Sequence, residues 1–237
     1  MIEPLTESLA LASRLDALRA RIRAAEVHAG RPPGSIELLA VSKTFPAAAI
    51  AALHAHGQRS FGENYVQEAL VKIAELAPRY IEWHFIGRIQ SNKTRVIAEY
   101  FTWAHGLDRL AIAQRLNDQR PADAAPLDVC IEVNVDNESS KAGVSLAALP
   151  ELAHAITSLP RLRLRGLMVL PAPTADFGLQ QAAFARAQTA LNDLRRQGLT
   201  LDTLSMGTSG DLEAAVAAGA TIVRIGTALF GPRESAR

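Results

Sequence analysis

Apolar residues recur with two different periods along this chain. Near the start they fall three or four positions apart, as on one face of a helix: Leu11, Leu15, Leu18, Ile22 and Ala25. Gly30 and Pro32 interrupt this pattern. The sequence therefore predicts an N-terminal helix over about residues 5–29.

The rest of the chain alternates short apolar runs with alanine-rich stretches of helical period. The runs predict strands at residues 37–43, 59–63, 83–87, 101–105, 127–135, 163–170, 203–206 and 221–225. The stretches between them predict helices at residues 47–56, 65–76, 92–99, 109–118, 146–159, 177–197 and 212–218. Strands that alternate with helices indicate parallel βαβ units, which are buried on both faces and therefore read as continuous apolar runs.

Two architectures fit this order of elements: an open doubly wound sheet and a closed barrel. Eight strands favour closure, since a (β/α)8 TIM barrel takes about 250 residues and the chain has 237. No Pro/Gly/Ser-rich linker divides the chain. We therefore expect an α/β protein with one domain over residues 1–237, in which a barrel over about residues 36–232 follows the N-terminal helix.

Composition and charge narrow the classes of function. The 25 Lys and Arg residues nearly balance 24 Asp and Glu, and this formal charge of +1 lacks the basic excess of nucleic-acid-binding proteins. One cysteine excludes a disulfide within the chain and a multi-cysteine metal cage, and we predict no metal site. Neither a targeting signal nor an apolar run of about 18 residues is present. We expect a cytoplasmic protein without nucleic-acid or membrane partners.

Function in such a barrel gathers at the carboxyl ends of the strands. Lys43 ends the first predicted strand, in the run LLAVSKT. Apolar surroundings disfavour the ammonium form of a lysine, and a neutral amine is what condensation with an aldehyde requires. The alternative is a strand-end lysine that extends its charge into water.

The last two strands end in turns of small residues. The run MGTSGDL follows the seventh strand, and RIGTA ends the eighth. Backbone N–H groups at such helix starts can bind an anion, and the hydroxyls of Ser209 and Thr227 add donors. The loops after strands 7 and 8 commonly bind phosphate in this fold, although a plain turn with a helix cap also explains the pattern.

A lysine and a phosphate site on one barrel end describe a pocket for a phosphorylated aldehyde. Both pyridoxal 5′-phosphate and a phosphorylated sugar held by an aldolase-type lysine fit this description. Arg224 distinguishes the two, because a cation from strand 8 could face a pyridine nitrogen and keep it unprotonated.

Six ordered motifs add a resemblance to a known family. They are AVSKT at 40–44, FGENYVQE at 61–68, WHFIG at 83–87, QSNK at 90–93, RGLM at 165–168 and VRIGTALFG at 223–231. With these motifs, which extend over about residues 5–232, the chain resembles the pyridoxal phosphate homeostasis protein family.

The resemblance implies a barrel like the N-terminal domain of alanine racemase, with pyridoxal 5′-phosphate bound to Lys43 as an internal aldimine. It implies that Ser209, Gly226 and Thr227 hold the phosphate and that Arg224 faces the pyridine nitrogen.

The resemblance also implies that Asn64 lines the site. One motif departs from the family pattern: residues 206–211 read MGTSGD where MGMSDD is expected. Ser209 is retained, so we expect phosphate binding with altered side-chain contacts in the turn.

The family is regarded as a carrier or regulator of the cofactor pool that influences amino-acid and keto-acid balance, without an established turnover. The resemblance therefore implies pyridoxal 5′-phosphate and cofactor-dependent apoenzymes as partners, no catalytic residue, and a monomer or weak dimer. A regulator that docks on such enzymes is a further possibility.

The alternative is a cofactor-dependent amino-acid racemase. Two-base racemisation needs an acid/base group on each face of the substrate. Lys43 can be one; in alanine racemase the other is a tyrosine of a second β-domain, which this chain is expected to lack. Tyr65 or a second subunit would have to replace it.

Three other residues carry weaker hypotheses. His84, expected after a strand, could transfer protons or form a supporting hydrogen bond. Lys141, in the loop after the fifth strand, could receive the cofactor during transfer, or it is a solvated loop lysine. Cys130 lies mid-strand among apolar neighbours and is expected to pack rather than react.

Overall fold

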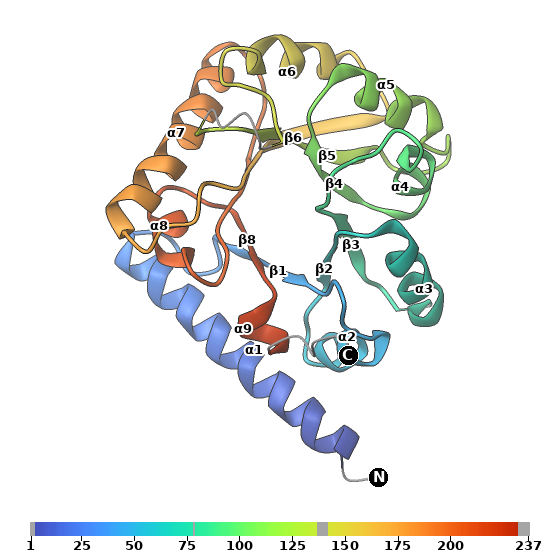
Figure 1. Ribbon diagram of the computed structural model, residues 1–237, viewed down its shortest axis with the longest axis vertical. Coiled ribbons are helices and arrows are strands. Elements are labelled where there is room, and N and C mark those ends of the chain that lie inside the picture. Colours follow the sequence, from blue (N-terminus) through green and yellow to red (C-terminus); the bar gives the residue numbers. More distant parts are fainter. Residues whose placement is uncertain (1–2, 78, 137–141, 232–237) are drawn as a thin grey trace.

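Eight parallel strands close into a barrel in which each strand pairs with its sequence neighbour (Figure 1). The computed structural model describes residues 3–77, 79–136 and 142–231, so Lys141 lies outside the described residues. The strands are β1 (Glu37–Val41), β2 (Ser60–Glu63), β3 (Glu82–Phe85), β4 (Trp103–Leu107), β5 (Leu127–Val133), β6 (Leu162–Val169), β7 (Thr203–Ser205) and β8 (Ile222–Ile225). Pairing of β1 with β8 closes the ring, which confirms the predicted (β/α)8 barrel.

Helices surround the barrel, and a long N-terminal helix crosses its outside (Figure 1). They are α1 (Glu3–His28), α2 (Ala47–Ala55), α3 (Val66–Leu76), α4 (Thr94–Tyr100), α5 (Leu110–Gln119), α6 (Leu149–Thr157), α7 (Phe177–Arg196), α8 (Leu212–Ala217) and α9 (Thr227–Phe230). The helix α1 packs against α2, α8 and α9 and so covers the side where the chain closes on itself. None of the helices in the described part of the chain combines the length and apolarity of a membrane crossing.

The core has two apolar regions. The larger one lies between strands and helices. The smaller one contains Leu39, Trp103, Cys130, Met168 and Ile222, whose positions alternate with those of the outer region along the strands. Cys130 is fully buried there, which confirms that it packs.

Some element ends differ from the sequence prediction. The strand β1 ends at Val41, so Lys43 follows the strand by two residues. The strand β4 begins at Trp103 rather than at residue 101, because Phe101 is the C-cap of α4 and donates its N–H to Ile97.

Two further differences concern single features. The short helix α9 was not predicted, since four residues are too few to show a helical period. The prediction that His84 follows a strand is wrong. It lies inside β3 and is fully buried, and its ring stacks on Trp103.

Candidate functional site

A cavity of about 300 Å³ opens at the carboxyl ends of the strands near the β1–β8 seam. Its lining is Val41, Lys43, Phe45, Asn64, Ile86, Leu170, Thr208, Ser209, Gly210, Arg224, Gly226 and Thr227. All six residues that the sequence singled out as cofactor-binding are in this set. Segments that are far apart in the chain therefore meet around one space.

Lys43 stands on a tight turn that leaves the sheet. The backbone N–H of Ser42 still donates to Gly62 of β2 at 3.0 Å, and the N–H of Phe45 turns back to the carbonyl of Ser42 at 3.0 Å. Between them Thr44 has φ of 69°, the single positive φ of a non-glycine residue in the described part of the chain. The turn places Lys43, which is partly exposed, on the cavity wall.

A buried charge network fixes this turn from behind. The Nζ of Lys72 lies 2.7 Å from the Glu63 carboxylate and donates to the carbonyl of Ser42 at 2.8 Å. Glu63 also accepts a hydrogen bond from the Ser42 hydroxyl at 2.6 Å. The carboxylate of Glu68 pairs with Lys72 and accepts the N–H of Thr44. Burial raises the pKa of Glu63, and the hydrogen bond from Lys72 opposes that rise. Both neighbours of Lys43 are therefore held by groups outside the cavity.

The loop after β7, which carries Ser209, turns at a glycine. Gly207 has φ of 97°, and a Cβ there would lie 2.6 Å from the Cβ of Ala215, so the turn requires glycine. The N–H and hydroxyl of Thr208 both donate to Asp211, at 2.5 and 2.8 Å. Thr208, a departure from the family pattern, thus stabilises the turn itself.

The loop after β8 lies beside it. Gly226 caps α9, and Thr227 begins that helix. A Cβ at Gly226 would lie 3.3 Å from the carbonyl oxygen of Val41, so the loop also packs closely against the end of β1. First-turn N–H groups have no carbonyl partner within their own helix and are suited to an anion. The turn before α8 and the start of α9 therefore bring Ser209, Gly226 and Thr227 to the cavity wall.

Arg224 of β8 also lines the cavity. Its guanidinium is almost fully buried and donates to the Ser205 carbonyl, to the Ser205 hydroxyl at 2.9 Å and to the Val169 carbonyl at 2.8 Å. Burial lowers the pKa of Arg224 to about 10, and Asp211 opposes the change. The side chain is therefore a fixed cation at neutral pH.

Sequence reasoning named His84 as a hydrogen-bonding residue but missed His105 and Ser205, which form a chain of buried polar groups with it beneath Arg224. The Ser205 hydroxyl lies 2.8 Å from Nδ1 of His105, and Nε2 of His105 lies 3.0 Å from Nδ1 of His84. Desolvation lowers the pKa of both histidines, that of His84 to about 3, so both rings are neutral. The sequence signal for these residues was their alternation with apolar residues along the strands. The same alternation also fits ordinary packing residues.

Asn64 and Tyr65 are adjacent in the chain but differ in their position relative to the cavity. The Oδ1 of Asn64 is buried at the cavity and has no hydrogen-bond partner among the described residues. The side chain of Tyr65 is 57% exposed and lines a neighbouring hollow instead. Asn64 therefore lines the same cavity as Lys43, whereas Tyr65 does not.

Comparison with known proteins gives one consistent family. The family model described as "Alanine racemase, N-terminal domain" matches residues 13–234. The curated pyridoxal phosphate homeostasis protein of Pseudomonas aeruginosa is 60% identical over 224 residues, which are 94% of this chain and 96% of that protein. The chain belongs to the pyridoxal phosphate homeostasis protein family. The resemblance drawn from six motifs is confirmed.

Solved structures agree with this assignment. PipY of Synechococcus elongatus PCC7942, solved with PLP bound, is 40% identical with a TM-score of 0.82, over 93% of this chain and 100% of that one. Alanine racemase from Corynebacterium glutamicum is 20% identical with a TM-score of 0.68, over 94% of this chain and 62% of that one. The second likeness shows the barrel fold alone.

Proposed function

We propose that this chain binds pyridoxal 5′-phosphate in the cavity, with Lys43 as the attachment point, and acts as a carrier or regulator of the cofactor pool. The observation that supports this most directly is that one cavity is lined by a lysine, the turn before α8, the start of α9 and a fixed arginine. Membership in a family named for pyridoxal phosphate homeostasis, and a relative solved with PLP bound, support the same ligand.

The residues of the cavity fit this cofactor. A volume of about 300 Å³ is at the lower end of small-ligand sites. Val41, Ile86 and Leu170 give apolar walls for a flat ring, and the orphaned Oδ1 of Asn64 is an acceptor that a ligand donor can satisfy. When bound, pyridoxal 5′-phosphate supplies an aldehyde that condenses reversibly with an amine and releases water.

Each polar residue then has a distinct task. Ser209, Gly226 and Thr227 would bind the phosphate through hydroxyl and N–H donors. Lys43 would offer its amine, and the network behind residues 42 and 44 would keep that amine directed into the cavity. Arg224 would face the ring nitrogen and, as a fixed cation, disfavour its protonation. An unprotonated ring withdraws electrons weakly, which suits holding the cofactor more than catalysis with it.

Among the described residues, the cavity offers no second acid/base group for a racemase. Of the described residues that line it, Lys43 and Arg224 are the ionisable ones, and Arg224 is held by three hydrogen bonds. Tyr65, the candidate for the second base, lines a different hollow. We therefore favour delivery to cofactor-dependent apoenzymes over amino-acid turnover.

A transfer assay separates the two functions. The full-length protein is loaded with pyridoxal 5′-phosphate, freed of excess cofactor, and mixed with an apoenzyme that regains activity when it receives the cofactor. We expect activation with wild type and none with Lys43→Ala, whereas Lys93→Ala, a change at a partly exposed lysine of the neighbouring hollow, behaves as wild type. Racemisation of L-alanine faster than by free cofactor, without apoenzyme activation, would contradict the proposal.

A further inference from the structure

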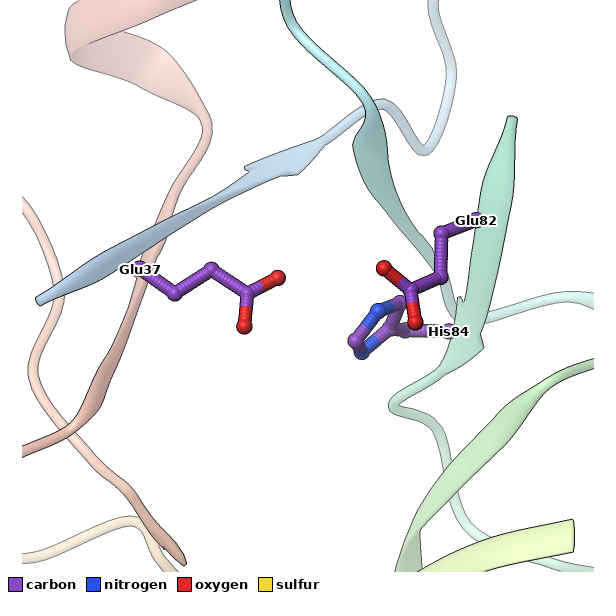
Figure 2. Close-up of side chains that lie close together, drawn as sticks. All are labelled: Glu37, Glu82 and His84. Atoms are coloured by element: carbon purple, nitrogen blue, oxygen red, sulfur yellow. The ribbon is translucent and has the colours of Figure 1, made fainter. Parts of the chain in front are cut away.

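A second cluster of chemically capable side chains lies at the opposite end of the barrel. Glu37 begins β1 and Glu82 begins β3, so both carboxylates stand at the amino ends of their strands. His84 follows Glu82 by two residues and points to the same side of β3. Figure 2 shows Glu37 reaching from β1 toward the imidazole of His84 and the carboxylate of Glu82.

The geometry points to a divalent metal site formed by Glu37, Glu82 and His84. One ligand atom from each residue lies within 4.8 Å of the other two. A closed tetrahedral shell with bonds of about 2.0–2.1 Å needs ligand atoms about 3.4 Å apart. Rotation of the partly exposed Glu37 side chain toward Glu82 and His84 can close that difference.

The free nitrogen of His84 is an independent sign of a ligand. Nε2 of His84 is buried and has no hydrogen-bond partner among the described residues, although the residue is fully buried. A buried polar atom without a partner costs free energy, which a bound ion would recover. With Nδ1 engaged by His105, an imidazole that carries its proton on Nδ1 presents a lone pair at Nε2.

The surroundings already supply the supporting bonds that metal ligands normally have. A ligating histidine usually has its other ring nitrogen hydrogen-bonded, and Nδ1 of His84 lies 3.0 Å from His105. Trp103 donates to Glu82 at 3.1 Å, and Ser60 donates to the other Glu82 oxygen at 3.4 Å. Trp103 also stacks on the His84 ring at 5.3 Å, which fixes the plane of the ring.

Local charge also favours a cation. Two carboxylates in this partly buried corner repel each other, and a divalent ion between them removes that repulsion. Arg165 is the nearby cation, but its N–H groups are bound to Asp128 at 2.9 Å and to Asp202 at 2.7 Å. Its N–H groups are therefore already bound to two other carboxylates.

One imidazole and two carboxylates suit a first-row transition ion such as Zn²⁺ better than Mg²⁺ or Ca²⁺, which prefer oxygen ligands alone. The amino end of a barrel serves stability rather than chemistry. We therefore assign the ion a structural role, in which it links β1 to β3 across the barrel interior. This inference does not depend on the proposed function.

Metal binding to the full-length chain tests the site directly. After removal of metals with a chelator, ZnCl₂ is titrated calorimetrically, and retained zinc is measured after desalting. We expect one zinc ion per chain and a higher Tm with zinc. Glu37→Gln and Glu82→Gln should each weaken binding at least about tenfold, whereas Glu75→Gln on the exposed face of α3 should not.

The absorption spectrum of bound Co²⁺ reports which ligand atoms surround the metal. It is recorded for wild type and for a variant that folds normally. We expect bands of a site with nitrogen and oxygen ligands in wild type, and their loss in His84→Asn, which keeps a partner for His105. Absence of stoichiometric zinc in wild type would overturn the proposal. So would wild-type affinity in the Glu37→Gln/Glu82→Gln double variant, since the ion would then lie elsewhere.

Discussion

Lys43 owes its position to residues that do not line the cavity. Lys72 is 5% exposed, yet it bonds Glu63 and the carbonyl next to Lys43. The sequence could indicate Lys43 because it follows an apolar strand, and the family motif supported it. It could not indicate Lys72, since a lysine on a helix normally faces water.

Loss of the Lys72 charge should lower the free energy of unfolding. We expect Lys72→Met to destabilise the fold by about 3 kcal/mol, because it leaves the Glu63 carboxylate buried without its partner. Urea unfolding measures the change. The double variant Lys72→Met/Glu63→Gln should recover part of the loss, and a double variant less stable than Lys72→Met would contradict this account.

Two glycines of the loop after β7 form a matched pair. Gly207→Ala places a methyl group 2.6 Å from the Cβ of Ala215 at a φ of 97°, and we expect a loss of about 2–3 kcal/mol. Gly210→Ala meets open space and should change stability by less than about 0.5 kcal/mol. Equal stabilities of the two variants in chemical denaturation would show that the loop is not constrained as described.

At the scale of elements, α1 supports the loops that follow β7 and β8. Arg21 donates to the Ser209 carbonyl at 3.0 Å and pairs with Glu213 of α8 at 2.7 Å, while Arg14 donates to the Phe230 carbonyl of α9 at 3.0 Å. The sequence predicted this helix and its apolar face. It could not show where the arginines bind, because their partners are about 190 or more residues away.

The Arg21–Glu213 pair predicts a pH dependence of stability. The hydrogen bond from Arg21 lowers the pKa of Glu213 below its ordinary 4.5, so the stabilisation is present above pH 4.5 and is lost as the pH falls through the folded-state pKa. Both side chains are more than a third exposed, so the pair contributes less than about 1 kcal/mol.

Unfolding of Glu213→Gln and wild type, measured from pH 7 to pH 3, checks this. The wild-type advantage should be constant down to about pH 5 and should decrease as the pH falls further below 4.5. Glu151→Gln on α6 serves as the control. An advantage that grows as the pH falls would have the wrong sign for this pair.

At the scale of the whole molecule, the cavity spans the seam where the barrel closes. Lys43 follows β1, while Ser209 and Thr227 follow β7 and β8, and β1 pairs with β8. Eight apolar runs were enough to predict the closed barrel. These runs could not reveal which polar side chains lie in the barrel interior. Glu82 and His84, and Ser205 within β7, alternate along their strands in the same way as ordinary packing residues.

A ligand across this seam should stabilise the entire fold. At a pyridoxal 5′-phosphate concentration of 100 times Kd, the free energy of unfolding should rise by about 2.7 kcal/mol. Thermal unfolding at increasing cofactor concentration measures the effect. Lys43→Ala should show a smaller rise, since the phosphate contacts remain, and an unchanged Tm in wild type would argue against binding at the seam.

The central claim is that Lys43 holds the cofactor, and chemical fixation tests it most directly. The chain contains four lysines, at 43, 72, 93 and 141. Sodium borohydride makes the link between the cofactor aldehyde and an amine irreversible, and peptide mass spectrometry then locates the added mass. We expect stoichiometric label on the peptide with Lys43 and none in Lys43→Ala. Label that persists in Lys43→Ala, or that lies on Lys72, Lys93 or Lys141 in wild type, would contradict it.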